Sequence, residues 1–304
     1  MEDFQKQLVV GISTRALFDM EEENKIYEEQ GVKAYCEYQV SHENEPLKPG
    51  AGFALVKALL KLNERDKSDR VAEVIIMSRN SADTGLRIFN SIRYYGLDIT
   101  RAALVSGASL APYLSAFNTD LFLSADEGDV QRAIDAGIAA GIICTEHVPD
   151  MDYGKEIDQI RIAFDGDAVI FSDESEIIFK EHGVDAFQEN ERENAKKLLP
   201  EGPFAKLLKT ISTLQKKYEG EPPIKTALVT SRNAPAHERV IRTLRAWDVK
   251  IEESFFLGGI PKREILKAFG AHIFFDDQDI HTEVASEVVP SARVPYKSKA
   301  KAEQ

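Results

Sequence analysis

An internal repeat constrains the fold of this chain more than any other feature. The segment IYEEQGVKAY (26–35) returns 152 residues later as IFKEHGVDAF (178–187), with five of ten positions identical and two where one aromatic residue replaces another. The same offset relates 105–126 to 257–278, with leucine, alanine and phenylalanine residues in register. A period near 150 is far longer than the roughly 20–50 residues of a solenoid repeat. It predicts a duplicated domain.

Both copies follow one pattern of short apolar segments alternating with amphipathic ones. In the second copy the pattern predicts strands at 160–164, 226–230, 254–257 and 272–275, and helices at 236–247 and 262–269. Such alternation indicates an α/β fold, a parallel sheet with helices on both faces. The alignment slips by one residue where Phe53 pairs with Phe204. We expect a first lobe at 1–150 and a second at 151–304, with the boundary in the polar stretch 146–156.

Composition excludes several classes of partner. The net charge of −13 argues against a nucleic-acid partner, whose phosphates attract basic surfaces. No apolar run approaches the roughly 20 residues of a membrane span, and the acidic N-terminus lacks the apolar core of a signal peptide. Cys36 and Cys144 form no motif, so we expect reduced thiols. These features favour a cytoplasmic protein without a membrane partner, and they leave formation of a homo-oligomer open.

The copies differ at the predicted carboxyl ends of the strands, which is where parallel α/β sheets bind ligands. The second copy carries acids, a hydroxyl and a lysine there: Asp165, Asp167, Thr230, Lys262, Asp276 and Asp277. The aligned residues of the first copy are Ser13, Arg15, Ser78, Leu110, Ser124 and Ala125. The first copy therefore keeps the hydroxyl and loses every acid and the lysine. We predict that only the second copy is catalytic.

Phosphoryl transfer is the chemistry that this set of residues favours. An ionised Asp165 can attack phosphorus without a separate base and form an aspartyl-phosphate. Asp167, two residues later, can protonate the leaving oxygen and then take a proton from the attacking water. That second role requires a raised pKa, which a neighbouring carboxylate would provide by repulsion.

The remaining residues fit the binding of a metal ion and a phosphate. Converging carboxylates repel one another unless a cation joins them, and oxygen ligands favour Mg²⁺. The predicted metal ligands are Asp165, Asp167, Asp276 and Asp277. Thr230 would donate a hydrogen bond to a phosphoryl oxygen, and Lys262 would neutralise charge there. Ser231 and Arg232, which follow Thr230, are further candidates for phosphate contacts.

Four segments carry a resemblance to a known family. In order, FDGDAVIFSDESE, VTSRNA, GGIPK and FFDDQ resemble the four motifs of the haloacid dehalogenase (HAD) superfamily of phosphohydrolases. Over nearly its whole length the chain is similar to the cytosolic type I 5′-nucleotidases, which hydrolyse nucleoside 5′-monophosphates with Mg²⁺. The resemblance implies a HAD-like Rossmannoid sheet, with the Asp165 strand central. Because the spacing from Thr230 to Lys262 accommodates only a helix and a strand, we expect a small helical cap at 172–200.

Two alternative functions stay open, because the predicted site residues contact the phosphate and not the leaving group. The chain could hydrolyse another small phosphate ester, such as a sugar phosphate, or it could sense nucleotides with vestigial catalysis. We interpret the charged segment 189–197 as a solvated helix face. The six histidines show no spacing typical of metal ligands.

The first copy admits a structural and a binding interpretation. It could serve only as a scaffold that packs against the catalytic lobe. Alternatively, its hydroxyls and arginines form a non-hydrolytic site for part of the substrate or for a nucleotide effector, because a guanidinium binds phosphate without a metal. The candidate residues are Arg15, Ser78, Arg79, Asn80 and Ser109, with backbone N–H groups of 107–109.

Overall fold

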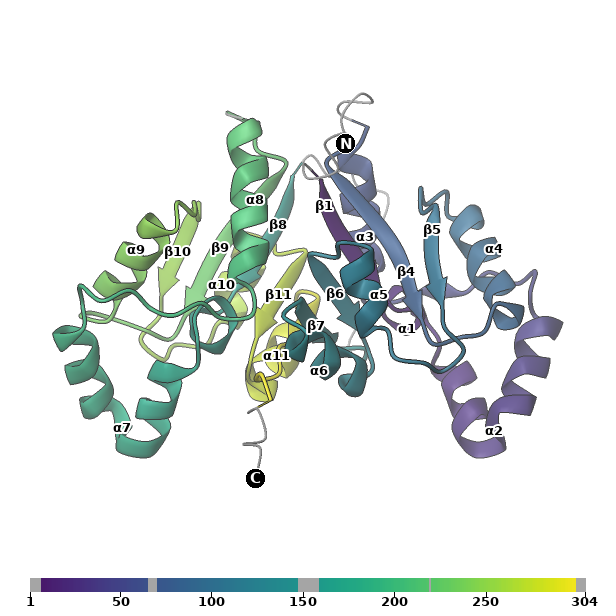
Figure 1. The fold of residues 1–304 in the computed structure, drawn as a ribbon, viewed down its shortest axis with the longest axis horizontal. Coiled ribbons are helices and arrows are strands. Elements are labelled where there is room, and N and C mark those ends of the chain that lie inside the picture. The colour runs from purple at the N-terminus through teal and green to yellow at the C-terminus, as the bar shows by residue number, and fades with distance from the viewer. Residues whose placement is uncertain (1–6, 65–69, 147–158, 219, 299–304) are drawn as a thin grey trace.

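Ten short strands form one continuous sheet in the computed structural model, which describes residues 7–64, 70–146, 159–218 and 220–298 (Figure 1). Their order across the sheet is β10-β9-β8-β11-β12-β7-β6-β1-β4-β5. The strands are β1 (Leu8–Ile12), β4 (Ala72–Ser78), β5 (Arg101–Leu104), β6 (Leu121–Ser124), β7 (Ala139–Ile143), β8 (Ile160–Phe164), β9 (Ile224–Thr230), β10 (Glu253–Phe256), β11 (Ile273–Asp276) and β12 (Ser291–Arg293). A separate small sheet pairs β2 (Phe18–Asp19) with β3 (Lys48–Pro49).

The two halves of the large sheet have the same strand order. Numbered along the chain, the five strands of each half lie side by side in the order third, second, first, fourth, fifth: β5-β4-β1-β6-β7 in the first half and β10-β9-β8-β11-β12 in the second. All pairs within a half are parallel, whereas β7 and β12 pair in antiparallel fashion where the halves meet. The predicted α/β fold is confirmed, and β8 is the middle strand of its half. The shared order is what an internal duplication predicts.

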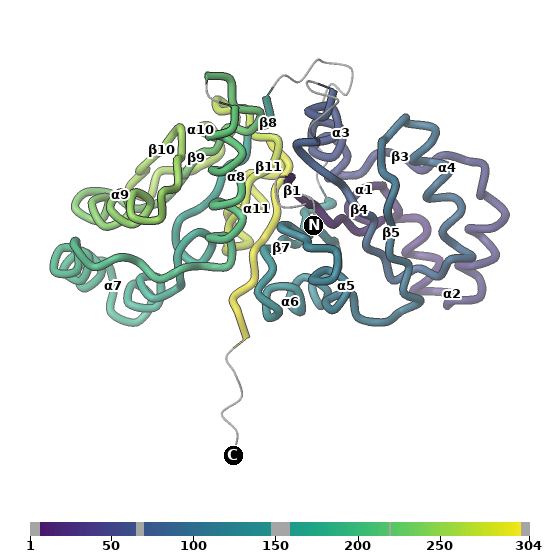
Figure 2. Tube along the Cα trace, turned by 45° about the horizontal axis from the view of Figure 1, so that its top comes forward, coloured from purple at the N-terminus to yellow at the C-terminus, as the bar shows by residue number. Residues whose placement is uncertain are grey.

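Helices cover both faces of the sheet (Figures 1 and 2). They are α1 (Thr14–Leu17), α2 (Glu21–Ser41), α3 (Phe53–Leu62), α4 (Leu86–Tyr94), α5 (Ala111–Ala116), α6 (Glu127–Asp135), α7 (Glu174–Glu193), α8 (Ala205–Lys217), α9 (His237–Ala246), α10 (Arg263–Phe269) and α11 (Asp279–Ser286). Because the helices leave neither face to solvent, central strands such as β1 and β4 are buried at every residue. The larger of two hydrophobic core clusters runs through both halves, from Leu8 to Val294, and the smaller one lies in the second half.

The repeated segment forms a bent helix in each half. The bends lie at Gly31 in α2 and Gly183 in α7, where φ is +82° and +81°. A Cβ at either glycine would meet no atom within 4 Å, so glycine is required for its backbone conformation and not for space. Two aromatic rings meet edge to face in each bent helix: Tyr27 with Tyr35, and Phe179 with Phe187.

The two bent helices lie at the two lower corners of Figure 1, on the same side of the molecule. Helix α7 falls inside the segment 172–200 that we predicted as a cap, and α2 is its counterpart in the first half. The predicted domain boundary at 146–156 lies, apart from residue 146, outside the described residues, and the division into two domains stays a prediction. Within the described ranges, no helix is both long and apolar enough to cross a membrane.

His272, directly before β11, is hydrogen-bonded to β8, and its lowered pKa predicts that stability depends on pH. Its backbone N–H donates to the Arg161 carbonyl at 2.7 Å, and its Nδ1 accepts from the Arg161 N–H at 3.0 Å. Burial and the Arg161 charge lower the pKa of His272 to about 4. In the unfolded chain the pKa is about 6.5, so the unfolded state binds the proton first as the pH falls. This contribution to stability is complete above about pH 6.5 and is lost as the pH approaches 4.

We expect the wild-type protein to lose about 2 kcal/mol more stability than the His272→Asn variant between pH 7 and pH 5. The asparagine can still accept from Arg161 but takes up no proton. Urea unfolding of both proteins at the two pH values measures the difference, and His182→Asn, a change at an exposed histidine, should keep the wild-type slope. Equal slopes for wild type and His272→Asn would contradict the assignment.

Candidate active site

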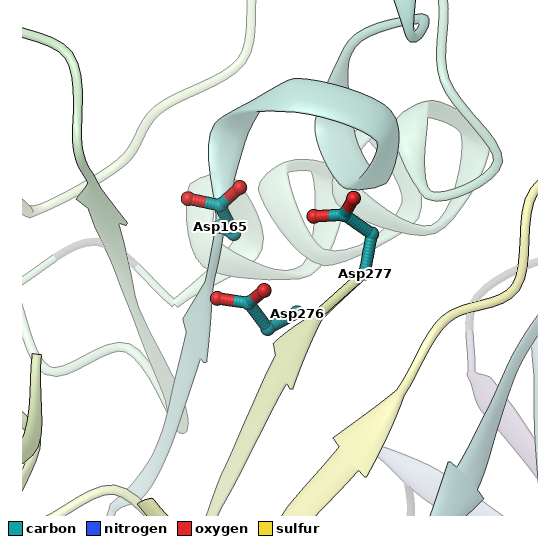
Figure 3. A group of neighbouring side chains, drawn as sticks. All are labelled: Asp165, Asp276 and Asp277. Carbon is teal, nitrogen blue, oxygen red and sulfur yellow. The ribbon is translucent and has the colours of Figure 1, made fainter. Parts of the chain in front are cut away.

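Three buried carboxylates converge at the carboxyl ends of β8 and β11. Asp165 directly follows β8, Asp276 is the last residue of β11, and Asp277 comes next. The two strands are parallel neighbours, and the Asp165 N–H continues their ladder by donating to the Phe275 carbonyl at 2.8 Å. The three side chains point toward one another (Figure 3), and one oxygen of each lies within 4.8 Å of the others. Hard oxygen donors this close together can hold a divalent cation.

Lys262 joins two of these acids. It precedes α10, in a turn where Gly258 and Gly259 both have positive φ. Its buried Nζ donates to Asp165 Oδ1 at 2.7 Å and to Asp276 Oδ2 at 2.6 Å. Burial opposes the lysine charge, but the carboxylates of Asp165 and Asp276 outweigh burial and raise the pKa of Lys262. The lysine is therefore a fixed cation within the acid cluster.

One lysine does not neutralise the cluster. Burial raises the pKa of Asp165 to about 8, although Lys262 opposes the shift. Burial also raises the pKa of Asp277 to about 6, against a hydrogen bond from the Tyr296 hydroxyl. For Asp276, burial is outweighed by His281 and Lys262, and its pKa is lowered. Full ionisation of all three acids near neutral pH therefore requires additional positive charge.

Asp167 takes part in a different interaction. The loop after β8 turns through Ala168, whose φ is +60°, and it places the Asp167 carboxylate against Arg232. Arg232 Nε donates to Asp167 Oδ2 at 2.8 Å, and Nη2 donates to Oδ1 at 2.6 Å. Our prediction puts Asp167 among the metal ligands; in the structure its carboxylate faces this guanidinium and lies outside the group of three acids.

The same arginine links the loop after β8 to helix α7. Its Nη1 donates to Glu191 Oε2 in α7 at 2.5 Å, and Arg239 of α9 donates to Glu191 Oε1 at 2.9 Å. The ring of Phe187, also in α7, lies 5.2 Å from the Arg232 guanidinium carbon. The prediction that 189–197 is a solvated face is wrong at Glu191, which is fully buried. A buried charge persists when it is paired, and here two arginines pair with it.

Of two further predicted residues, Thr230 lies beside the acids and Ser231 does not. Thr230 ends β9 and is buried, and a Cβ placed on Gly166 would lie 3.4 Å from its hydroxyl oxygen. The hydroxyl is thus beside the loop between Asp165 and Asp167. Its oxygen also accepts from the Arg232 N–H at 3.2 Å. Ser231, the first residue after β9, is exposed and is not part of the cluster of acids.

Sequence reasoning missed two residues that contact the acids. His281 Nδ1 lies 3.2 Å from Asp276 Oδ2, and the Tyr296 hydroxyl donates to Asp277. The hydrogen bond to Asp276 raises the pKa of His281. His281 follows Asp276 by five residues at the start of α11, a spacing that could have suggested contact. Tyr296 follows β12 and carried no such signal.

Comparison with known proteins gives a consistent result over the whole chain. A family model described as 5′-nucleotidase matches residues 1–301. Human cytosolic 5′-nucleotidase 1B is 40% identical over 304 residues, covering 96% of this chain and 49% of the human protein. The chain thus spans about half the length of this curated relative. No solved structure gives a significant match.

Proposed function

This chain belongs to the 5′-nucleotidase family, and on that basis we propose that it hydrolyses nucleoside 5′-monophosphates to a nucleoside and inorganic phosphate. The observation that carries the proposal is the buried group of three carboxylates, two of which Lys262 joins. Phosphoryl transfer needs a nucleophile, a proton donor and positive charge around the phosphate. The loop after β8 supplies the first two, and Lys262 supplies part of the third.

We assign the nucleophile to Asp165 and proton transfer to Asp167. A carboxylate oxygen of Asp165 forms a bond to phosphorus while the bond from phosphorus to the substrate O5′ breaks. Asp167, once it has turned away from Arg232 and taken up a proton, gives that proton to O5′. Water then attacks the aspartyl-phosphate, loses a proton to Asp167 and releases phosphate from Asp165. Lys262 and the Thr230 hydroxyl would bind phosphoryl oxygens during both steps.

Proton transfer by Asp167 requires a change in its hydrogen bonds. Arg232 binds both of its oxygens, and at least one of these bonds must give way to O5′ or water. Glu191 binds the same guanidinium at 2.5 Å, so Arg232 keeps a buried carboxylate partner when Asp167 turns away. The cap helix α7 therefore supports the movement that the mechanism needs.

The acid cluster fits Mg²⁺. Its donors are carboxylate oxygens, and Lys262 alone leaves the pKa of Asp165 at about 8 and that of Asp277 at about 6. We propose that Asp165, Asp276 and Asp277 hold the ion. When bound, Mg²⁺ would supply the positive charge that keeps these carboxylates ionised and neutralises the substrate phosphate.

A phosphate-release screen tests the proposed reaction. Nucleoside monophosphates, their deoxy forms and sugar phosphates are compared with Mg²⁺ and with EDTA. We expect release from nucleoside monophosphates, lost in EDTA and restored by excess Mg²⁺. Preferential release from sugar phosphates would replace the proposed substrate class. Nucleotide binding without release of phosphate from any ester would favour the alternative of a nucleotide-sensing protein with vestigial catalysis.

The metal assignment predicts a specific defect in Asp276→Ala. Loss of one ligand should weaken Mg²⁺ affinity by about tenfold or more, because the remaining acids and waters must complete the coordination. The Mg²⁺ dependence of phosphate release and direct calorimetric titration both measure this change. Asp279→Ala, three residues later at an exposed acid that pairs with Arg293, is the matched control. Unchanged Mg²⁺ affinity in Asp276→Ala would place the metal elsewhere.

A further inference from the structure

The first half contains a pocket of about 470 Å³ at the position that corresponds to the active site. Its floor is formed by residues 13–15 after β1 and 78–81 in the segment that ends β4, and Ser124 at the end of β6 also lines it. By the 152-residue offset these positions match the segments that carry Asp165, Thr230 and Asp276. Helix α2 contributes the opposite wall. The volume falls within the roughly 300–1,000 Å³ of small-molecule sites.

The floor lacks the acids that hold a metal and has guanidinium groups instead. Ser13 and Ser124 stand where Asp165 and Asp276 stand in the other half, and Arg15 and Arg79 line the pocket. Arg15 contacts Glu21 at 3.5 Å, and Arg79 contacts Asp126 at 3.3 Å. Both arginines are more than a third exposed, so these long ion pairs contribute little and can exchange for another anion.

Two of the three acids that line the pocket, Asp129 and Glu23, have cationic partners other than Arg79. Asp129, 3.6 Å from Arg79, also pairs with Arg132 at 2.5 Å. Glu23, a third acid of the lining, pairs with the buried Arg87 at 2.7 Å. If a ligand bound to Arg79, Asp129 would still be paired with Arg132, and Glu23 would still be paired with Arg87.

Two buried donors at the pocket have no acceptor among the described residues. They are Arg15 Nε and Asn80 Nδ2, each belonging to a residue of the lining. An unpaired buried donor costs free energy, and native structures hold few of them. Two in one pocket, beside two guanidinium groups, are suited to a ligand with several acceptor oxygens, such as a phosphate.

The wall opposite the floor suits a flat apolar group. Tyr27 and Tyr35 of α2 line the pocket with their ring centroids 5.9 Å apart, and Val32 lies between them in sequence at the bend. The Tyr35 hydroxyl donates to Asn80 Oδ1 at 3.3 Å, so the wall and the floor are connected. Aromatic side chains of this kind stack on nucleobases.

We propose that this pocket binds one nucleoside monophosphate without a metal ion. The phosphate lies between Arg15, Arg79 and Asn80, and the base lies against the tyrosines of α2. Two groups named in the sequence analysis do not contribute. Ser109 does not line the pocket, and the Gly107 N–H, in the loop after β5, donates to the Arg79 carbonyl in the loop after β4. The site is separate from the proposed catalytic one and takes no part in hydrolysis.

Cys36 gives a direct test because it lines the pocket, whereas Cys144 directly follows β7 and does not line the pocket. Both thiols are free and partly exposed. The protein is treated with iodoacetamide in EDTA, with and without millimolar AMP, and alkylation of each cysteine is followed by peptide mass spectrometry. We expect AMP to slow alkylation of Cys36 several-fold and to leave Cys144 unchanged. Adenosine, which lacks the phosphate, should protect Cys36 less.

Variants assign the protection to the pocket. Arg79→Ala and Arg15→Ala should each abolish the protection of Cys36 by AMP. Arg132→Ala is the matched control, because it also removes a cation from Asp129 but does not line the pocket, and it should retain protection. The Cys36 alkylation rate without AMP and the circular dichroism spectrum report whether each variant is folded.

Three results would overturn the proposal: no protection of Cys36 by AMP, equal protection of both cysteines, or protection that persists in both pocket arginine variants. The assay contains EDTA and follows no hydrolysis, so its outcome is independent of the proposed activity. Phosphate release from AMP with an unprotected Cys36 would reject the second site alone. Protection without phosphate release would reject the proposed hydrolysis alone.

Discussion

The Asp165→Asn protein should release phosphate on the order of 10⁴–10⁶-fold more slowly than the wild type, while keeping its fold. The amide is nearly the same size as the carboxylate but cannot form the acyl-phosphate bond. It can still accept a hydrogen bond from Lys262, which lies 2.7 Å from Asp165 Oδ1. Steady-state release from a nucleoside monophosphate at saturating Mg²⁺ measures the loss.

A matched control variant and a Mg²⁺ titration test whether the loss in Asp165→Asn comes from the missing nucleophile. Asp248→Asn makes the same chemical change at an 86% exposed side chain, in a position of positive φ that asparagine tolerates well, and it should leave turnover unchanged. Raising Mg²⁺ should partly restore Asp276→Ala but not Asp165→Asn, because only the second has lost the nucleophile. Substantial steady-state turnover by purified Asp165→Asn would refute the covalent mechanism.

The Asp167→Asn protein should lose roughly 10²–10⁴-fold in turnover of nucleoside monophosphates. An asparagine can keep a hydrogen bond to Arg232 but has no proton to give to O5′. The loss should be much smaller for p-nitrophenyl phosphate, whose leaving group departs without a proton. The ratio of the two losses separates proton transfer from general damage to the site.

The cap contact supplies the control for Asp167→Asn. Glu191 binds the same arginine as Asp167 but does not face the acid cluster. Glu191→Gln should therefore impair both substrates to a similar degree, since it alters the position of Arg232 and not the proton. Equal losses for the two substrates in Asp167→Asn itself would contradict the acid–base assignment.

The elements of this fold follow from local sequence patterns, because strand and helix periodicities are local. The predicted helix at 236–247 is observed as His237–Ala246, and the predicted strand at 226–230 begins two residues earlier, at Ile224. The convergence of Asp165 with Asp276 and Asp277 was also predictable. Parallel strands in one sheet end at the same edge, so acids at strand ends meet there.

Other features depend on residues far apart in the sequence and could not be inferred locally. Glu191 lies in a run of charged residues, yet it is buried because Arg232 and Arg239, from elements 41 and 48 residues later, enclose it. The contact of Tyr296 with Asp277 depends on the path of the chain after β12. The pairing of β7 with β12 likewise has no signature in either strand.

That pairing has a consequence for the order of folding during synthesis. Every other strand pair of the first half joins strands that lie within the first 143 residues. These pairs can therefore form before the second half has been made. The pairing of β7 with β12 is short, with Ala292 opposite Ile143 and Arg293 opposite Ile142. Until β12 emerges, β7 is an apolar strand with an unpaired edge, a template for pairing with other chains. The nascent chain should therefore be most prone to aggregation after its first half is complete and before its second half is complete. Pairing of β12 with β7 should then cover the exposed strand edge and lower this tendency to aggregate.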